Sequence, residues 1–273
     1  MRFEGTERYG KKILKSILNV LISCGINPIL LLQSFRGIPI FLRDLISFEK
    51  KVCRVAKPSF TITTLYPIFN DRFVESGIAS GHYFHQDLLI ARRIFFNTPT
   101  KHVDIGSRID GFVAHVAAFR EIEVFDIRPL PRRIENVTFT RIDIMRDDLD
   151  MLDYTDSLSS LHAVEHFGLG RYGDPIDPDG HIKGLNNMYK FLKAGGKFYL
   201  SLPIGKQRIE FNAHRIFSLE YILFLIGGKY RIDRFSYVDD NGDLFDHVPL
   251  AEKDIKQNYG CHYGCGIFEL TKE

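Results

Sequence analysis

The chain has 273 residues and a mass of 31.5 kDa, which suits one large α/β domain or a core of about 150–200 residues with an appendage. Hydrophobic residues make up 45% and charged residues 26%, so the sequence encodes a packed core and excludes global disorder. The formal net charge of +2 lacks the strongly basic balance typical of nucleic-acid binding, so we expect no such partner. Four cysteines are too few for a disulfide scaffold and favour a reducing, cytoplasmic location.

Residues 1–57 predict a helical appendage, and residues 58–273 predict the main domain. The longest apolar stretch, 13–32, contains Lys15 and is broken at 25–28. A membrane-spanning helix needs roughly 20 mainly apolar residues without such a break. The stretch therefore predicts two short amphipathic helices and no transmembrane segment.

A secretion signal is the competing interpretation of this stretch. Lys11 and Lys12 precede the apolar run, and the tetrapeptide 21–24 resembles a lipoprotein cleavage box. We favour the appendage because Lys15 interrupts the run. A second apolar run, 38–48, either packs on the core or contacts a membrane or another subunit, so peripheral membrane contact and oligomer formation stay open.

Strands and helices alternate after residue 58. Strand-like runs cover 60–71, and helices are expected at 82–96, 112–120, 181–192 and 218–226. Further strands are expected at 102–105, 121–127, 137–144, 157–164, 197–202, 230–237 and 266–271. Such alternation predicts right-handed crossovers and a parallel sheet, with a ligand at the carboxyl ends of the strands.

The segment 103–112 predicts a strand, a turn at Gly106 and a helix. Asp126 ends the next strand, 20 residues after Gly106, which is the spacing of a carboxylate that binds a ribose. A dinucleotide needs bare backbone against its pyrophosphate, but Arg108 and Asp110 stand in this loop. The loop therefore favours S-adenosylmethionine (SAM), which carries no phosphate.

Five segments carry a resemblance to a known family: 103–106, 124–127, 141–144, 159–166 and 191–197. Through them, residues 101–204 resemble the class I SAM-dependent methyltransferases, and within these a little-characterised branch associated with glycan biosynthesis. The resemblance implies an α/β, Rossmann-like, seven-stranded, mostly parallel sheet whose last strand is antiparallel. It also implies SAM as the cofactor and a small-molecule or glycan substrate.

Cofactor contacts are expected along the same segments. The resemblance and the spacing assign them to Asp104, Gly106, Ser107, Asp126, Ile127, Asp143 and Ile144. Gln86 and Asp87 open the helix before the first of these strands and are expected to reach the amino group of the methionine. The alternatives are a solvated charge at each strand end and, for Asp87, a favourable charge at the positive helix terminus.

The pentapeptide 162–166 lies where methyl transfer would occur. We expect His166 first, His162 second, to take the proton of a hydroxyl acceptor, with Glu165 beside them. Capping of the strand is the alternative. The residues also match the H-x-x-E-H motif of zinc proteases, but a strand would hold the two histidines about 13 Å apart, so we expect no metal there.

Two further motifs follow. Asn212, His214 and Arg215 are expected to bind the acceptor, because arginine can hold a carboxylate or phosphate of an acidic sugar. The alternative is a helix-entry loop with Ser218 as N-cap. The segment 261–265 provides two cysteines and one histidine, which is half of a zinc site, so it predicts a hairpin without metal.

The sequence therefore predicts a cytoplasmic methyltransferase that O-methylates a sugar or glycan precursor by in-line transfer, with a histidine as general base. A Rossmann-like binding or scaffold protein without catalysis is the alternative, because Arg108 and Asp110 make the cofactor loop irregular. A metallopeptidase is the third and least favoured hypothesis.

Overall fold

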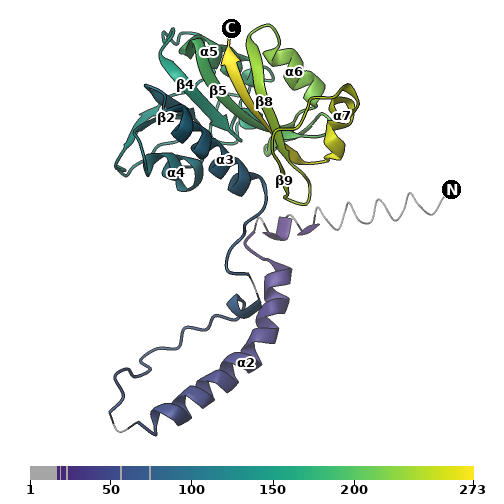
Figure 1. Ribbon diagram of the computed structural model, residues 1–273. Coiled ribbons are helices and arrows are strands. Elements are labelled where there is room, and N and C mark those ends of the chain that lie inside the picture. Colours follow the sequence, from purple (N-terminus) through teal and green to yellow (C-terminus); the bar gives the residue numbers. More distant parts are fainter. Residues whose placement is uncertain (1–16, 19, 23, 56, 74) are drawn as a thin grey trace, which may run out of the picture. The chain divides into compact units, whose positions relative to one another are not determined.

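The computed structural model describes residues 17–273 except 19, 23, 56 and 74 (Figure 1). The described residues therefore exclude the start of the apolar run with Lys11, Lys12 and Lys15. They also exclude Ser23 of the tetrapeptide that resembles a cleavage box. The chain divides into two compact units, Met1–Gly77 and Ile78–Glu273. Residues 58–77 thus group with the N-terminal helix, whereas the sequence placed the boundary at 57.

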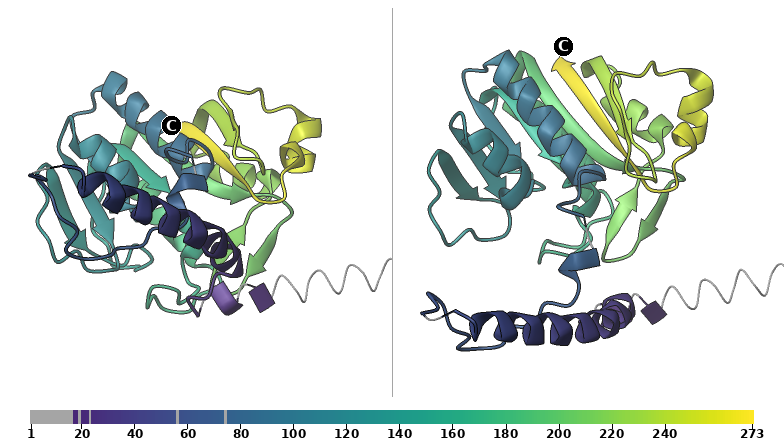
Figure 2. Two further views of the ribbon diagram at one scale, coloured as in Figure 1. Left: turned by 90° about the horizontal axis from the view of Figure 1, so that it is seen from below. Right: turned by 60° about the horizontal axis from the view of Figure 1, so that its bottom comes forward.

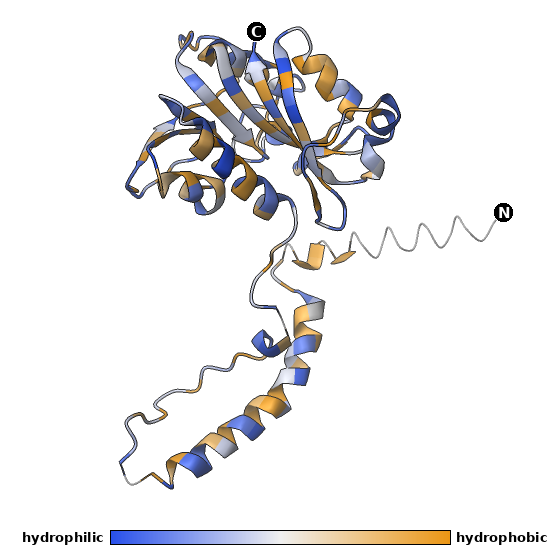
Figure 3. Ribbon diagram, viewed as in Figure 1, coloured by the Kyte–Doolittle hydropathy of each residue, from blue (hydrophilic) through white to orange (hydrophobic). Residues whose placement is uncertain are grey.

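The first unit is built on helix α2 (Pro28–Val52). Pro28 suits the first helical position, and the Asn27 side chain accepts a hydrogen bond from Leu30 N at 3.2 Å, so the chain enters the helix at the expected break. With 25 residues α2 is longer than the short helices expected, and apolar and charged residues alternate along it (Figure 3).

The strand-like runs predicted at 60–71 are wrong. The backbone there is irregular and ends in a short 3₁₀ turn, Asp71–Phe73. Pro67 lacks a backbone donor, and no described strand pairs with this segment. Of its aromatic residues, Phe69 packs on α2, since its ring lies 5.8 Å from that of Phe41, whereas Phe60 and Tyr66 are exposed. No helix in the described part of the chain combines the length and the apolar character that a membrane crossing requires.

Eight strands form the sheet of the second unit: β1 (His102–Ile105), β2 (Ile122–Asp126), β3 (Val137–Arg141), β4 (Thr155–Leu161), β5 (Leu192–Ile204), β8 (Tyr230–Val238), β9 (Leu244–Phe245) and β10 (Gly264–Lys272). Their order is β3-β2-β1-β4-β5-β10-β8-β9. The first five pair in parallel, and β10 runs antiparallel to both of its neighbours. The Rossmann-like, mostly parallel sheet is confirmed, while the expected seven strands become eight through β9.

The remaining elements of this unit are α3 (His82–Asn97), a π-helical turn (Ile109–Val113), α4 (Ala114–Ala117), a 3₁₀ turn (Val164–His166), α5 (Gly180–Phe191), α6 (Leu219–Ile226), α7 (Glu252–Gln257), a second 3₁₀ turn (Asn258–Gly260) and the hairpin β6 (Arg208–Glu210)–β7 (His214–Ile216). The hairpin replaces an expected loop. The Ser218 side chain caps α6 by accepting from Tyr221 N, as the alternative interpretation of this segment has it. Two strands end earlier than predicted, β3 at Arg141 and β4 at Leu161.

Helices cover both faces of the sheet (Figure 2). Successive strand residues point to opposite faces, and the core follows this alternation. Val124 and Tyr199 pack in one cluster with residues of α3 and α4, whereas Phe125 and Phe198 pack in another with residues of α5 and α6. The two layers fix the strand ends and therefore the loops that follow them.

A substitution at Phe268 would test this packing. Phe268 lies on β10, is fully buried, and its ring centroid is 4.8 Å from that of Phe235. We expect Phe268→Ala to lower the free energy of unfolding by about 3–5 kcal/mol, because the cavity left behind collapses only in part. Urea unfolding measures the change, and Phe211→Ala, at a 75% exposed position, should alter it by less than about 0.5 kcal/mol. Equal effects would contradict this core assignment.

Candidate functional site

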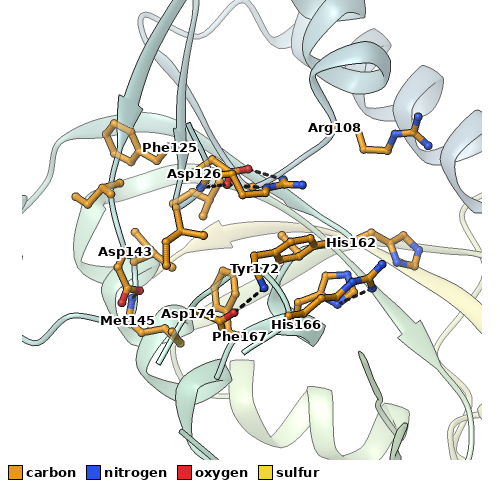
Figure 4. A pocket seen from close by; sticks show the side chains of 18 of the residues that line it. Arg108, Phe125, Asp126, Asp143, Met145, His162, His166, Phe167, Tyr172 and Asp174 are labelled. Carbon is orange, nitrogen blue, oxygen red and sulfur yellow. Dashed lines mark hydrogen bonds and ion pairs between the residues drawn. The ribbon is translucent and has the colours of Figure 1, made fainter. Parts of the chain in front are cut away.

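A cavity of about 310 Å³ opens at the carboxyl ends of β1 to β4 (Figure 4). Its walls are the turn after β1 with Gly106, the end of β2 at 125–128, the loop after β3 at 142–145, the turn after β4, and the loop at 171–174. The strand order reverses beside β1, so the cavity lies at the switch point where open α/β sheets bind ligands.

The turn after β1 is shaped by Gly106. Its φ of +73° favours glycine, its N–H donates to the Phe125 carbonyl at 2.9 Å, and a Cβ there would lie 2.9 Å from Cβ of Ala163. Asp104 is fully buried behind the turn and accepts from the N–H of Ser107 at 3.0 Å and from its hydroxyl at 2.6 Å. Asp104 and Ser107 therefore hold the turn and do not line the cavity.

Burial governs the protonation of Asp104. It raises the pKa of this carboxyl to about 7, although the hydrogen bonds from Ser107 and Ser159 pull the pKa down. The Ser159 hydroxyl donates to Asp104 Oδ1 at 2.5 Å, which ties β4 to the end of β1. The carboxyl thus links the two strands on either side of the switch point.

Asp126 lines the cavity together with the Gly106 turn, as the sequence predicts. Its carboxylate is already paired. Arg128 donates to Oδ1 through its backbone N–H at 2.8 Å and to Oδ2 through its guanidinium at 2.5 Å (Figure 4). The Arg128 guanidinium also lies 4.4 Å from the centre of the Tyr172 ring. Sequence reasoning missed this arginine, although its position two residues after Asp126 was the available signal.

The loop after β3 supplies Asp143 and Ile144 to the cavity, and Ile127 joins them from the end of β2. Asp143 accepts a hydrogen bond from Met145 N at 2.9 Å, which fixes the loop. Ile144 is buried, so this wall of the cavity is largely apolar.

Gln86 and Asp87 are buried in α3 and do not line the cavity. Gln86 accepts from the Ser201 hydroxyl at 2.6 Å and donates to Asp87 at 3.1 Å. Burial raises the pKa of Asp87 to about 6. The residue of α3 that does reach the cavity is Tyr83, which sequence reasoning missed.

The residues 162–166 form a turn after β4 and not the end of a strand, which corrects the prediction. His162 has a φ of +51°, and the 3₁₀ turn begins at Val164. The short turn brings both histidines to one carboxylate: Glu165 Oε1 lies 2.7 Å from His162 Nδ1 and 3.7 Å from His166 Nε2. The strand-based separation of about 13 Å is therefore wrong. Since Glu165 lies between the histidines, they do not form the zinc-protease arrangement.

His162 and His166 line the cavity, whereas Glu165 supports them from behind. His166 Nδ1 lies 2.7 Å from the Ala213 carbonyl, so this nitrogen carries the proton and Nε2 keeps its lone pair in the neutral ring. Burial and the nearby Arg171 lower the pKa of His166. For His162, burial also lowers the pKa, but Cys265 and Glu165 raise the pKa by more than burial lowers it. The pKa of His162 therefore lies well above its ordinary value.

The residues expected to bind the acceptor lie on the β6–β7 hairpin and do not line the cavity. Asn212 is exposed in the turn. The His214 ring packs 5.0 Å from that of Tyr263. The Arg215 guanidinium donates to the carbonyls of Phe167 at 2.5 Å and Pro178 at 3.1 Å, so it braces the loop instead of holding an acid.

Two arginines to which the sequence analysis gave no binding role lie in the cavity wall. Arg108 and Arg171 both line it. Arg108 pairs with the exposed Asp110, and Arg171 donates to the Ala213 carbonyl at 3.0 Å. Arg108 is therefore already paired with a carboxylate, whereas Arg171 contacts a backbone carbonyl.

A family of Caenorhabditis proteins of unknown function, DUF268, matches residues 130–259. No curated protein matches the chain. Among solved structures, 1,6-didemethyltoxoflavin-N1-methyltransferase from Burkholderia thailandensis, with bound S-adenosylhomocysteine (SAH), is 14% identical over 68% of this chain and 78% of its own, with a TM-score of 0.48.

Two further solved structures are similar in the same way. The N-methyltransferase NodS from Bradyrhizobium japonicum, in complex with SAH, is 12% identical over 70% of this chain and 88% of its own, with a TM-score of 0.46. A SAM-dependent methyltransferase from Clostridium acetobutylicum is 12% identical over 69% and 91%, with a TM-score of 0.45.

Proposed function

We propose that this chain is a SAM-dependent methyltransferase and that SAM binds in the cavity at the carboxyl ends of β1 to β4. The observation that carries the proposal is the convergence of the Gly106 turn and Asp126 on one cavity at the switch point. A nucleoside needs hydroxyl-binding acceptors at one end and an apolar slot for its base. The Asp126 carboxylate provides the hydrogen-bond acceptors for the ribose hydroxyls. Phe125 and Ile144 border the apolar slot for the base.

We propose that the acceptor is a hydroxyl and that His166 is the general base. A base must be neutral at the working pH, hold its lone pair toward the substrate and reach the cavity. His166 lines the cavity, its pKa is lowered, and its Nδ1 faces a carbonyl, which leaves Nε2, 3.7 Å from Glu165 Oε1, as the nitrogen that would accept the proton. His162 fits less well, since its Nδ1 is held by Glu165 and its pKa is raised.

We propose a sugar or glycan precursor as the acceptor. The family resemblance of the sequence supports this class, and the arginines at the cavity wall suit an acidic sugar. The four cysteines are free thiols, which supports a cytoplasmic site of action.

The cofactor assignment is tested by calorimetric titration with SAH. We expect Asp126→Ala to weaken SAH binding about 10- to 100-fold, because hydrogen bonds from the ribose hydroxyls to a carboxylate contribute about 1.5–3 kcal/mol. Asp148→Ala is the matched control, since Asp148 also pairs with an arginine two positions away, at 2.5 Å, but is exposed and outside the cavity. Equal SAH affinity in both variants would refute the ribose assignment.

A Rossmann-like binding or scaffold protein is the second candidate. The pairing of Arg128 with Asp126 favours it, because ribose binding at Asp126 has to displace or share these hydrogen bonds. The same titration separates the two functions: a wild-type chain that binds neither SAM nor SAH supports the scaffold.

A further inference from the structure

We propose that His82, His162 and Cys265 form a binding site for one Zn²⁺ beside the cavity. One ligand atom from each of the three side chains lies within 4.8 Å of the other two, and this is the candidate metal cluster found among the residues that the structure describes. Imidazole nitrogen and thiolate sulfur are ligands that zinc prefers. The proposal does not rest on the proposed methyl transfer.

The fold brings these residues together from distant parts of the sequence. His82 opens α3, and His162 follows β4, where its backbone N–H donates to the Ser201 carbonyl of β5 at 3.1 Å. Cys265 is the second residue of β10 and pairs with Pro203 of the same β5. Because β10 is antiparallel, it begins at the edge where the parallel strands end. The three side chains therefore meet at the carboxyl edge of the sheet.

His162 is oriented as a metal ligand. Its side chain is only 2% exposed, and its Nδ1 lies 2.7 Å from the Glu165 carboxylate. Within the described part of the chain its Nε2 is buried without a hydrogen-bond partner. A histidine that binds a metal almost always donates its other ring N–H to such a carboxylate, which fixes the ring and directs the lone pair to the metal. A buried nitrogen without a partner is costly, and a metal ion would satisfy it.

The charges of the cluster suit a divalent ion. One thiolate and two neutral imidazoles around Zn²⁺ leave one positive charge, which Glu165 behind His162 neutralises. A buried site without net charge avoids the desolvation cost of an isolated ion. Zinc–nitrogen and zinc–sulfur bonds of about 2.0–2.3 Å set the ligand atoms about 3.3–3.7 Å apart. The His82 and His162 rings stack with their centroids 5.1 Å apart and their planes 12° apart, so at least one ring has to turn before both nitrogens can point at one ion.

The burial of Cys265 argues against its use as a reactive thiol. It is fully buried, and its Sγ lies 3.6 Å from the Gln86 side-chain oxygen. Reactive cysteines are partly exposed, whereas a structural metal ligand is enclosed. Three protein ligands leave a fourth position of the tetrahedron, and because His162 also lines the cavity, the ion would lie at the cavity wall.

The test uses Co²⁺ as a spectroscopic probe for the zinc site, with the full chain. We expect the wild type to bind about one equivalent of Co²⁺ with visible bands of tetrahedral coordination and a near-ultraviolet thiolate-to-cobalt band, and Zn²⁺ to displace it. Cys265→Ser should lose the thiolate band, and His82→Ala should weaken metal binding at least tenfold.

Cys261→Ser is the matched control, because Cys261 is a buried free thiol four residues away and outside the cluster. It should keep the wild-type spectrum. Circular dichroism shows whether each variant is folded, and Zn²⁺ should raise the melting temperature of the wild type and of Cys261→Ser but not of His82→Ala. A wild type that binds no Co²⁺, or a thiolate band that survives Cys265→Ser, would overturn the proposal. Neither result bears on SAH binding, so the cofactor assignment is judged separately.

Discussion

Replacing Gly106 with valine is expected to weaken SAH binding by more than about 100-fold, the largest effect of any single change in the cavity wall. The φ of +73° at this position costs an L-residue about 1–2 kcal/mol, and the added Cβ would meet Cβ of Ala163 at 2.9 Å. Either the turn or Ala163 has to move, and both line the cavity. Calorimetric titration with SAH measures the loss, and circular dichroism verifies the fold.

Gly195→Val separates backbone strain from the close approach. Gly195 has nearly the same φ, +74°, but a Cβ there would find no atom within 4 Å. The control should therefore lose some stability and keep wild-type SAH affinity. If both variants bind SAH equally, the close contact between the Gly106 turn and Ala163 has no part in cofactor binding.

The first strand and the turn at Gly106 could be predicted because their signals are local. The strand at 102–105 is buried along its whole length and precedes a glycine, and the observed strand has the same bounds. Gly106 and Asp126 are placed by the strand-turn-helix-strand pattern alone, and both line the cavity. Parallel strands buried on both faces usually read as continuous apolar runs, but here His102 and Asp104 alternate with Val103 and Ile105, and the glycine after Ile105 marks the strand end.

The turn after β4 could not be predicted, because its mixture of polar and apolar residues resembles that of the strand before it. Ala163 and Val164 suit a strand as well as a turn, and neither glycine nor proline marks the end of β4. The turn forms because His162 takes a positive φ and its ring bonds to Glu165. This local geometry depends on tertiary packing, since the turn lies between β5 and the cavity.

Contacts across long sequence distances were missed for a different reason. The antiparallel direction of the last strand was expected, but the cluster of His82, His162 and Cys265 also depends on the register of β10 against β5, which periodicity does not reveal. Similarly, Arg215 was expected to face the acceptor, but the unpredicted β6–β7 hairpin turns it toward the backbone carbonyls of the loop after β4. The register in which two strands pair decides which way each side chain points. A single sequence does not reveal that register.

His166→Gln is expected to reduce methyl transfer about 10²- to 10⁴-fold while SAH affinity stays at the wild-type level, because glutamine retains polarity but accepts no proton. The assay measures SAH release with a panel of sugar hydroxyl acceptors. Burial lowers the pKa of His166, as do Arg171 and His162, while Glu165 opposes them, and the rings of Tyr172 and His214 also lie near it. The neutral, basic form exists above this pKa, so wild-type activity should rise with pH below about 6.5 and level off above it.

The matched control for this prediction is His181→Gln. The His181 ring is also buried, its pKa is lowered to about 4 mainly by burial, and it bonds to the Tyr221 hydroxyl outside the cavity. It should keep both turnover and the acidic limb of the pH profile. If His166→Gln keeps turnover within tenfold of the wild type, or if its pH profile is unchanged, the proton is taken by another group. His162 is the other histidine in the cavity wall, and as the base its raised pKa would place the rise in activity at higher pH.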